Sequence, residues 1–219
     1  MENYKRMVVL LAAGASLLLA SQRTGGIPQS GLEESKPLTW VLIALGEDYN
    51  CFFTLEEAWQ EGEAAVKLES ASIRRSTDKG GLIQELEKVR QNVPDFSYEF
   101  NPVNPRVVHV IDARLKRQKS YALDGTITKL DFNGAINGLP NEIQKQGIRI
   151  STPTGQDTHE HRDGTTIVHV SGDGLSVRDA LSNFINLDGR GKILWIARTK
   201  LDPGAISYVF YPWPGKIER

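Results

Sequence analysis

Two histidines one residue apart are the first feature of this sequence that could do chemistry. His159 and His161 form an H-x-H pair, and on a β-strand both rings would point to one face, as zinc ligands can. His169 could supply a third ligand if the loop between them folded back. The neighbours Asp157 and Arg162 are typical of a solvated polar loop. A metal site of His159, His161 and His169 and an ordinary polar loop therefore both remain open.

A glycine-rich turn is the second candidate. Gly172-Asp173-Gly174 follows a predicted strand and opens a predicted helix, like the first half of a dinucleotide-binding fingerprint. The third glycine of that fingerprint is replaced by Val177, and the next strand follows too closely for a Rossmann unit. The pattern favours a plain tight turn. We predict no cofactor and nominate no catalytic residue, although the sequence leaves an enzymatic activity open.

Charge and cysteine content exclude several classes. The 219 residues carry 26 Lys+Arg and 27 Asp+Glu, a net charge of -1, which gives no broad field to attract nucleic acid. A basic run between Arg114 and Lys119 lacks interleaved aromatic residues and reads as a solvated connector. Cys51 is the single cysteine, so the chain cannot form an internal disulfide, and its apolar neighbours predict burial.

The elements that must position these residues follow from hydrophobic periodicity and turn signals. The best-patterned part is the last third, where Ser176 is a predicted N-cap. The order of elements predicts an α+β fold built of small β-α-β-β modules, with short helices packed on antiparallel or mixed sheets. We expect helices at 38–45, 81–92, 140–146 and 177–185, and strands at 51–55, 96–100, 107–111, 127–132, 148–150, 167–170, 193–197 and 206–211.

The N-terminus has the form of an export signal. Lys5 and Arg6 precede an apolar run over 8–20, thirteen residues long, which suits a signal peptide and is short for a membrane-spanning helix. The alternatives are a buried helix of a cytoplasmic protein and an uncleaved segment that anchors the chain weakly. The predicted organisation is a signal peptide at 1–20, a linker at 21–37, α+β regions at 38–100 and 101–152, a polar loop at 153–164, a β-α-β-β module at 165–213 and a tail at 214–219.

Two stretches sixty residues apart are alike. Val107-Val108-His109-Val110 matches Ile167-Val168-His169-Val170, with an aspartate and a leucine following each copy. Duplication of a small α+β module and a chance likeness between two β-rich strands both explain this.

The last third resembles the small modules at the N-termini of secretins and TonB-dependent receptors, the short N-terminal (STN) domain. The resemblance is carried by Leu175-Ser176-Val177, Ala180-Leu181, Phe184-Ile185, Leu194-Trp195 and the strand at 206–210. The whole chain is also similar to uncharacterised exported bacterial proteins, through the stretches at 108–115 and 193–199. The secretin pore-forming domain and the receptor barrel have no counterpart in the sequence, so the resemblance implies a stand-alone module.

These observations predict an exported, periplasmic or extracellular protein without enzymatic activity, which acts by binding another envelope protein. A membrane contact is expected only through an uncleaved N-terminal segment. The alternative is a secreted metal-assisted hydrolase that uses His159, His161 and His169.

Overall fold

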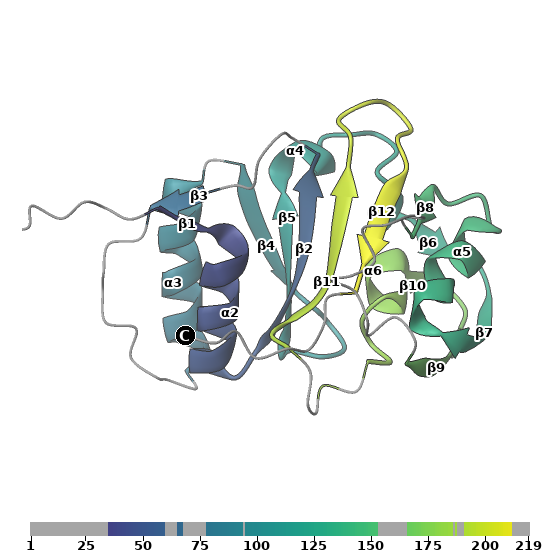
Figure 1. Cartoon of the computed structure of the whole chain (residues 1–219), viewed down its shortest axis with the longest axis horizontal. Helices are drawn as coiled ribbons and strands as arrows, with labels where there is room; N and C mark the ends of the chain where they lie inside the picture. The colour runs from purple at the N-terminus through teal and green to yellow at the C-terminus, as the bar shows by residue number, and fades with distance from the viewer. Residues whose placement is uncertain are drawn as a thin grey trace, which may run out of the picture. The chain divides into compact units, whose positions relative to one another are not determined.

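Six strands form a mixed sheet that carries the core of the computed structural model (Figure 1). The structure describes residues 35–59, 65–67, 78–93, 95–152, 166–185, 187 and 191–211, and those from Ser35 on belong to one compact unit. The predicted signal peptide, the linker up to 34, the whole polar loop at 153–164 and the tail at 214–219 lie outside the described residues. Within the described part, no helix is long and apolar enough to cross a membrane.

The sheet has the strand order β4-β5-β2-β11-β12-β8. Strand β2 pairs in parallel with β5 and β11, β12 pairs in parallel with β8, and the pairs β4–β5 and β11–β12 are antiparallel. This arrangement, with helices on the sheet, confirms the α+β class. The strands are β2 (Phe52–Ala58), β4 (Phe96–Phe100), β5 (Val107–Asp112), β8 (Ile150–Ser151), β11 (Ile193–Thr199) and β12 (Ser207–Phe210).

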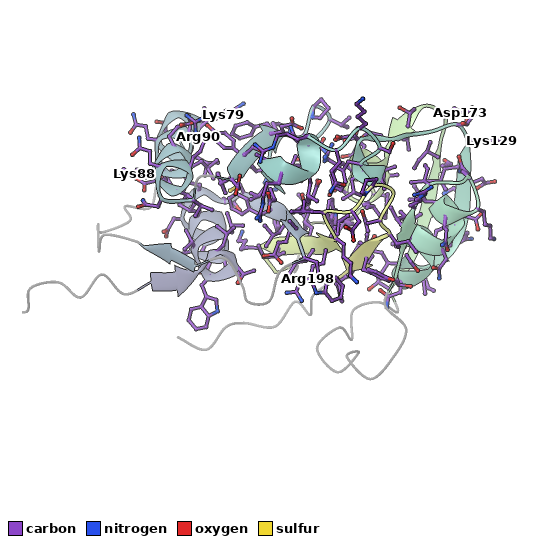
Figure 2. The ribbon with its side chains drawn as sticks, turned by 90° about the horizontal axis from the view of Figure 1, so that it is seen from above. Lys79, Lys88, Arg90, Lys129, Asp173 and Arg198 are labelled. Atoms are coloured by element: carbon purple, nitrogen blue, oxygen red, sulfur yellow. The ribbon has the colours of Figure 1, made fainter. Side chains whose placement is uncertain are left out.

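Two helices cover one face of the sheet on the side of β4, β5 and β2. They are α2 (Leu38–Tyr49) and α3 (Lys79–Asn92), where Asp78 caps the first turn of α3 by accepting from two backbone N–H groups. Leu42, Leu86 and Phe53 are fully buried between helices and sheet. The outer side of α3 carries i,i+3 ion pairs, and Figure 2 shows its Lys88 and Arg90 pointing away from the sheet.

Short elements cover the other face. They bury a second apolar cluster around Trp195, which is 0% exposed and donates from Nε1 to the Ser182 hydroxyl at 2.8 Å. Two of their strand pairs, β6–β10 and β7–β9, are separate antiparallel ribbons, as is the outlying pair of β1 (Ser35–Pro37) and β3 (Ala65–Lys67). The covering elements are α4 (Ala113–Lys116), η1 (Ala122–Asp124), β6 (Thr126–Ile127), β7 (Leu130–Ala135), η2 (Ile136–Gly138), α5 (Leu139–Gln144), β9 (Ile167–Gly172), β10 (Leu175–Ser176) and α6 (Val177–Ala180).

The last third is arranged differently from the single β-α-β-β unit that we expected. The β11–β12 hairpin forms as predicted, but β9 pairs with β7 in a two-stranded ribbon, and β11 pairs on its other side with β2. The reason lies in burial: β9 alternates exposed and buried residues, which suits a ribbon with one solvated face, whereas β11 is mostly buried. Ser176 caps α6 as predicted, but the α-helix ends at Ala180 and continues as turns.

The two similar strands also differ in their surroundings. His109 on β5 is 3% exposed, whereas the His169 side chain on β9 is 64% exposed and lies 3.5 Å from the Asp131 carboxylate. The shared residue pattern therefore occupies a buried sheet strand in one case and a half-solvated ribbon in the other.

A pair of tryptophan substitutions tests the position of the core. We expect Trp195→Ala to lower the free energy of unfolding by about 3–5 kcal/mol, because it empties a buried volume and leaves Ser182 without its donor. Trp40→Ala is the matched control; its side chain is 54% exposed, and we expect a change within about 0.5 kcal/mol. Denaturant unfolding measures both free energies. Equal losses of stability in the two variants would contradict the placement of Trp195 in the core.

Candidate functional site

A carboxylate lies in the middle of the buried sheet. Glu56 is 0% exposed because β2 has strands on both sides and packed elements on both faces. The two-residue alternation of β2 places Phe52, Thr54 and Glu56 on the face opposite α2 and α3. An ionised carboxylate in such a place needs a counter-charge and hydrogen bonds.

Arg178 supplies both. Its Nε and one terminal nitrogen donate to the two Glu56 oxygens at 2.5 and 2.9 Å, and its other terminal nitrogen lies 2.5 Å from the Asp124 carboxylate. The Tyr121 hydroxyl donates to Glu56 at 2.8 Å. The result is a continuous polar network, the Glu56–Arg178 network, that joins β2, η1 and α6 across the second core.

Burial and charge shift the pKa values of these groups in opposing ways. Burial raises the pKa of Glu56, and the Arg178 guanidinium opposes that shift. Burial lowers the pKa of Arg178, but the Glu56 carboxylate outweighs this effect, so that its pKa is raised overall. The pKa of Tyr121 is raised by burial and by the same carboxylate. On balance the pKa of Glu56 is raised. The bidentate contact of the guanidinium with both carboxylate oxygens has the geometry of an ion pair, and Tyr121 donates to it as a neutral hydroxyl.

A second buried polar group lies beside the first. The Asn101 Oδ1 accepts from the backbone N–H groups of residues 103 and 104, which identifies Nδ2 as the donor. This Nδ2 donates to the carboxylate of Asp179 at 3.1 Å and to Asn183 Oδ1 at 2.7 Å. The same Nδ2 lies 3.3 Å from His109 Nε2, and because Nδ2 can only donate, we assign Nε2 as the unprotonated nitrogen of the ring. With this assignment the ring proton is on Nδ1, which lies 2.8 Å from the Thr54 hydroxyl oxygen and can donate to it.

This arrangement holds His109 neutral. Burial lowers the pKa of His109 to about 4, and the positive charge of Arg178 acts in the same direction. A protonated ring would also direct an Nε2–H toward the amide donor of Asn101. His109 therefore acts as a neutral structural hydrogen-bonding group.

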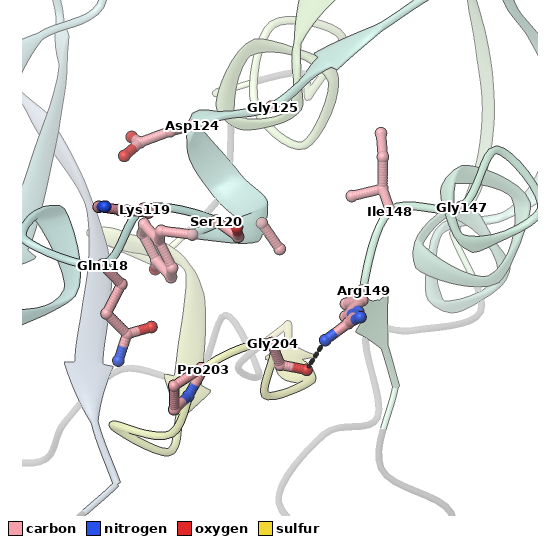
Figure 3. A pocket seen from close by; sticks show the side chains of 12 residues that line it. Gln118, Lys119, Ser120, Asp124, Gly125, Gly147, Ile148, Arg149, Pro203 and Gly204 are labelled. Atoms are coloured by element: carbon pink, nitrogen blue, oxygen red, sulfur yellow. Dashed lines mark hydrogen bonds between the residues drawn. The ribbon is translucent and has the colours of Figure 1, made fainter.

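A cleft opens to one side of the Glu56–Arg178 network. Its volume is about 620 Å³, and its walls come from three stretches of chain: 118–125 around η1, 147–149 before β8, and the β11–β12 turn at 203–204 (Figure 3). Tyr121 and Asp124 belong both to the network and to the lining. The complete lining is Gln118, Lys119, Ser120, Tyr121, Ala122, Asp124, Gly125, Gly147, Ile148, Arg149, Pro203 and Gly204.

One arginine joins two of the three stretches that line this cleft. Arg149 donates to the Gly204 carbonyl at 2.5 Å, a contact drawn as a dashed line in Figure 3. Gly204 has φ +72, and a Cβ there would collide with the Arg149 guanidinium. Glycine at this position therefore permits the turn, and because it has no side chain it leaves space for the Arg149 guanidinium against the backbone. Figure 3 shows Asp124 on the wall across from Arg149.

The structure locates only part of the histidine cluster. His159 and His161 lie outside the described residues, and His169 projects from the β7–β9 ribbon toward Asp131. Among the residues that the structure describes, no group of histidine, cysteine, aspartate and glutamate could hold a metal ion. The metal-assisted hydrolase stays a prediction that depends on His159 and His161.

Two other sequence features have structural roles. Gly174 has φ +71 in the turn between β9 and β10, and its N–H donates to the Ile127 carbonyl, as befits a tight turn. Cys51 is buried, and burial raises the pKa of its thiol to about 11.

No local pattern in the sequence marks Glu56 and Arg178 as partners. Polar residues that alternate along a strand usually face water, and the two residues are 122 positions apart. The signal that was available is local: Thr54 and Glu56 alternate with Phe53 and Leu55 in a strand where both faces are buried. This pattern indicates a buried polar pair only because β2 is a central strand of the sheet.

Comparison of the chain with protein-family models, with curated proteins and with solved structures found no match in any of the three. The likeness of residues 165–211 to STN modules therefore stays a prediction from their sequence.

The depressed pKa of His109 predicts how stability depends on pH. The unfolded chain takes up a proton near pH 6.5 and the folded chain near pH 4, so stability falls as the pH drops through that window, by up to about 3 kcal/mol. We expect His109→Gln to remove this part of the pH dependence of unfolding. His169→Gln, which removes an exposed imidazole from another sheet, is the control and should keep the wild-type profile. If the unfolding free energies of wild type and His109→Gln changed with pH in the same way, His109 would not be the source of this pH dependence.

Proposed function

We propose that this chain is an exported, non-enzymatic protein that binds a segment of another envelope protein in the cleft between 118–125, 147–149 and 203–204. The observation that carries the proposal is the cleft itself, whose volume of about 620 Å³ is in the usual range for binding sites. Export is supported by the basic and apolar pattern of residues 1–20.

The walls of the cleft suit an extended peptide. Gly147 has φ +82, and nothing lies within 4 Å of the place where its Cβ would be, so a bound chain can approach the backbone there. Ala122, Ile148 and Pro203 add apolar surface from all three stretches of the wall. Apolar contacts and accessible backbone together are what peptide-binding sites use.

The cleft is also held in shape before any ligand binds. The wall at η1 is tied to the sheet by Tyr121 and Asp124 through the Glu56–Arg178 network. The facing wall continues into β8, which pairs with β12, and Arg149 ties it to the turn at Gly204. A preformed site loses less conformational entropy on binding.

Site-specific photo-crosslinking in cells of the native host tests this function. A photoreactive residue at Ser120, on the cleft wall, should yield one discrete adduct with an envelope protein, whereas the same residue at Gln84, on the exposed side of α3, should not. The identified protein, purified, should bind the full chain, and Ser120→Trp, which fills the cleft, should weaken binding about tenfold or more.

Two results would overturn the proposal. One is an identical set of adducts from positions 120 and 84, which would mean that the cleft selects nothing. The other is unchanged affinity in Ser120→Trp, which would place the binding surface elsewhere.

A further inference from the structure

The basic run after β5 is neutralised at three of its four positions. Arg114 is paired with Asp112 at 2.5 Å, Arg117 lies 3.4 Å from Asp95, and Lys116 is paired with Glu99. Lys119, the last member of the run, lines the cleft and has no ion pair with any described carboxylate. Among the described residues, Lys119 is therefore the one cation of this run without a carboxylate partner, and it lines the cleft.

Arg149 is a second cation of the lining without a carboxylate partner among the described residues. Its partner is a neutral carbonyl, that of Gly204, and it has no ion pair with a carboxylate in the described part of the chain. The bond occupies one terminal nitrogen and leaves Nε and the other terminal nitrogen as donors. A guanidinium held in this way is arranged in advance for a planar, two-oxygen acceptor.

The acid in the cleft does not cancel these charges. Asp124 is bound to Arg178, which also compensates Glu56. The charged residues of the lining are thus two cations, Lys119 and Arg149, and one carboxylate, Asp124, which is already paired with Arg178. The net charge of these lining residues is therefore positive. Glu56 does not change this balance at the surface, because it is fully buried.

We infer that the cleft recognises a carboxylate on the bound segment, received by Arg149 with Lys119 as a second cation in the lining. This inference rests on the proposed function and names the chemistry of its partner. The carboxylate has two sources in a peptide: a free C-terminus or an aspartate or glutamate side chain. Both present two oxygens in one plane, which the free donors of Arg149 match.

Four short peptides separate these sources. Acetyl-Ala-Ala-Ala with a free C-terminus is compared with its C-terminal amide, and acetyl-Ala-Glu-Ala-amide with acetyl-Ala-Gln-Ala-amide. Each is titrated into the ¹⁵N-labelled full chain, and the amide signals of Ser120, Gly125, Arg149 and Gly204 are followed by NMR. We expect the carboxylate member of at least one pair to bind about tenfold more tightly than its neutral match, and the responding pair identifies the source.

Variants assign the effect to the arginine. Arg149→Gln should abolish the preference for the carboxylate, and Gly204→Ala, which displaces the guanidinium but keeps its charge, should weaken it. Lys145→Gln is the matched control, since its exposed ammonium lies near the cleft wall in sequence but is paired with Glu142 and is not in the lining. The amide spectrum of each variant reports whether it is folded.

The possible failures are distinguishable. If both members of each pair bind equally, the inference that the cleft recognises a carboxylate is wrong, and the cleft remains a peptide-binding site. Binding that persists in Arg149→Gln would overturn the role of the arginine. If no peptide shifts the cleft signals, the carboxylate inference fails, while the proposed function is decided separately by the adducts formed at Ser120.

Discussion

The carboxylate of Glu56 can occupy the middle of the sheet only because a guanidinium meets it there. Removing such a charge from water costs several kcal/mol, and a bidentate ion pair with further hydrogen bonds offsets that cost. Arg178 reaches Glu56 from a helix of only four residues, and Tyr121 completes the coordination of the carboxylate. Because these groups come from parts of the chain 122 positions apart, the second face of the sheet has one arrangement that satisfies them.

The same pair determines where the cleft lies. Arg178 uses its remaining nitrogen to hold Asp124, so the η1 wall cannot move without disturbing the buried charge. The opposite wall is fixed independently, by the pairing of β8 with β12 and by the bond from Arg149 to Gly204. The cleft is therefore the space between one wall anchored by an ion pair and another anchored by a sheet, which explains how irregular backbone can form a stable surface.

Local patterns in the sequence predicted most elements but not their neighbours. The helix at 81–92 and the strands at 96–100, 107–111 and 193–197 follow from periodicity, because each packs one or both faces on apolar residues. The parallel pairing of β2 with β5 and β11 depends on contacts far apart in the chain, which no local pattern encodes. The site was missed for the same reason, since Glu56 looks like a solvated strand residue until β2 is known to be central.

A double-mutant cycle on Glu56 and Arg178 tests this account most directly. Unfolding free energies are measured for Glu56→Gln, Arg178→Gln and the double variant. We predict that Arg178→Gln costs about 3–5 kcal/mol, since it leaves the buried Glu56 carboxylate without a counter-charge. Glu56→Gln should cost less, because Arg178 keeps its ion pair with Asp124, and the double variant should lose less than the sum by about 2 kcal/mol or more. Additive losses, or single losses below about 0.5 kcal/mol, would contradict the claim that this ion pair fixes the second face of the sheet.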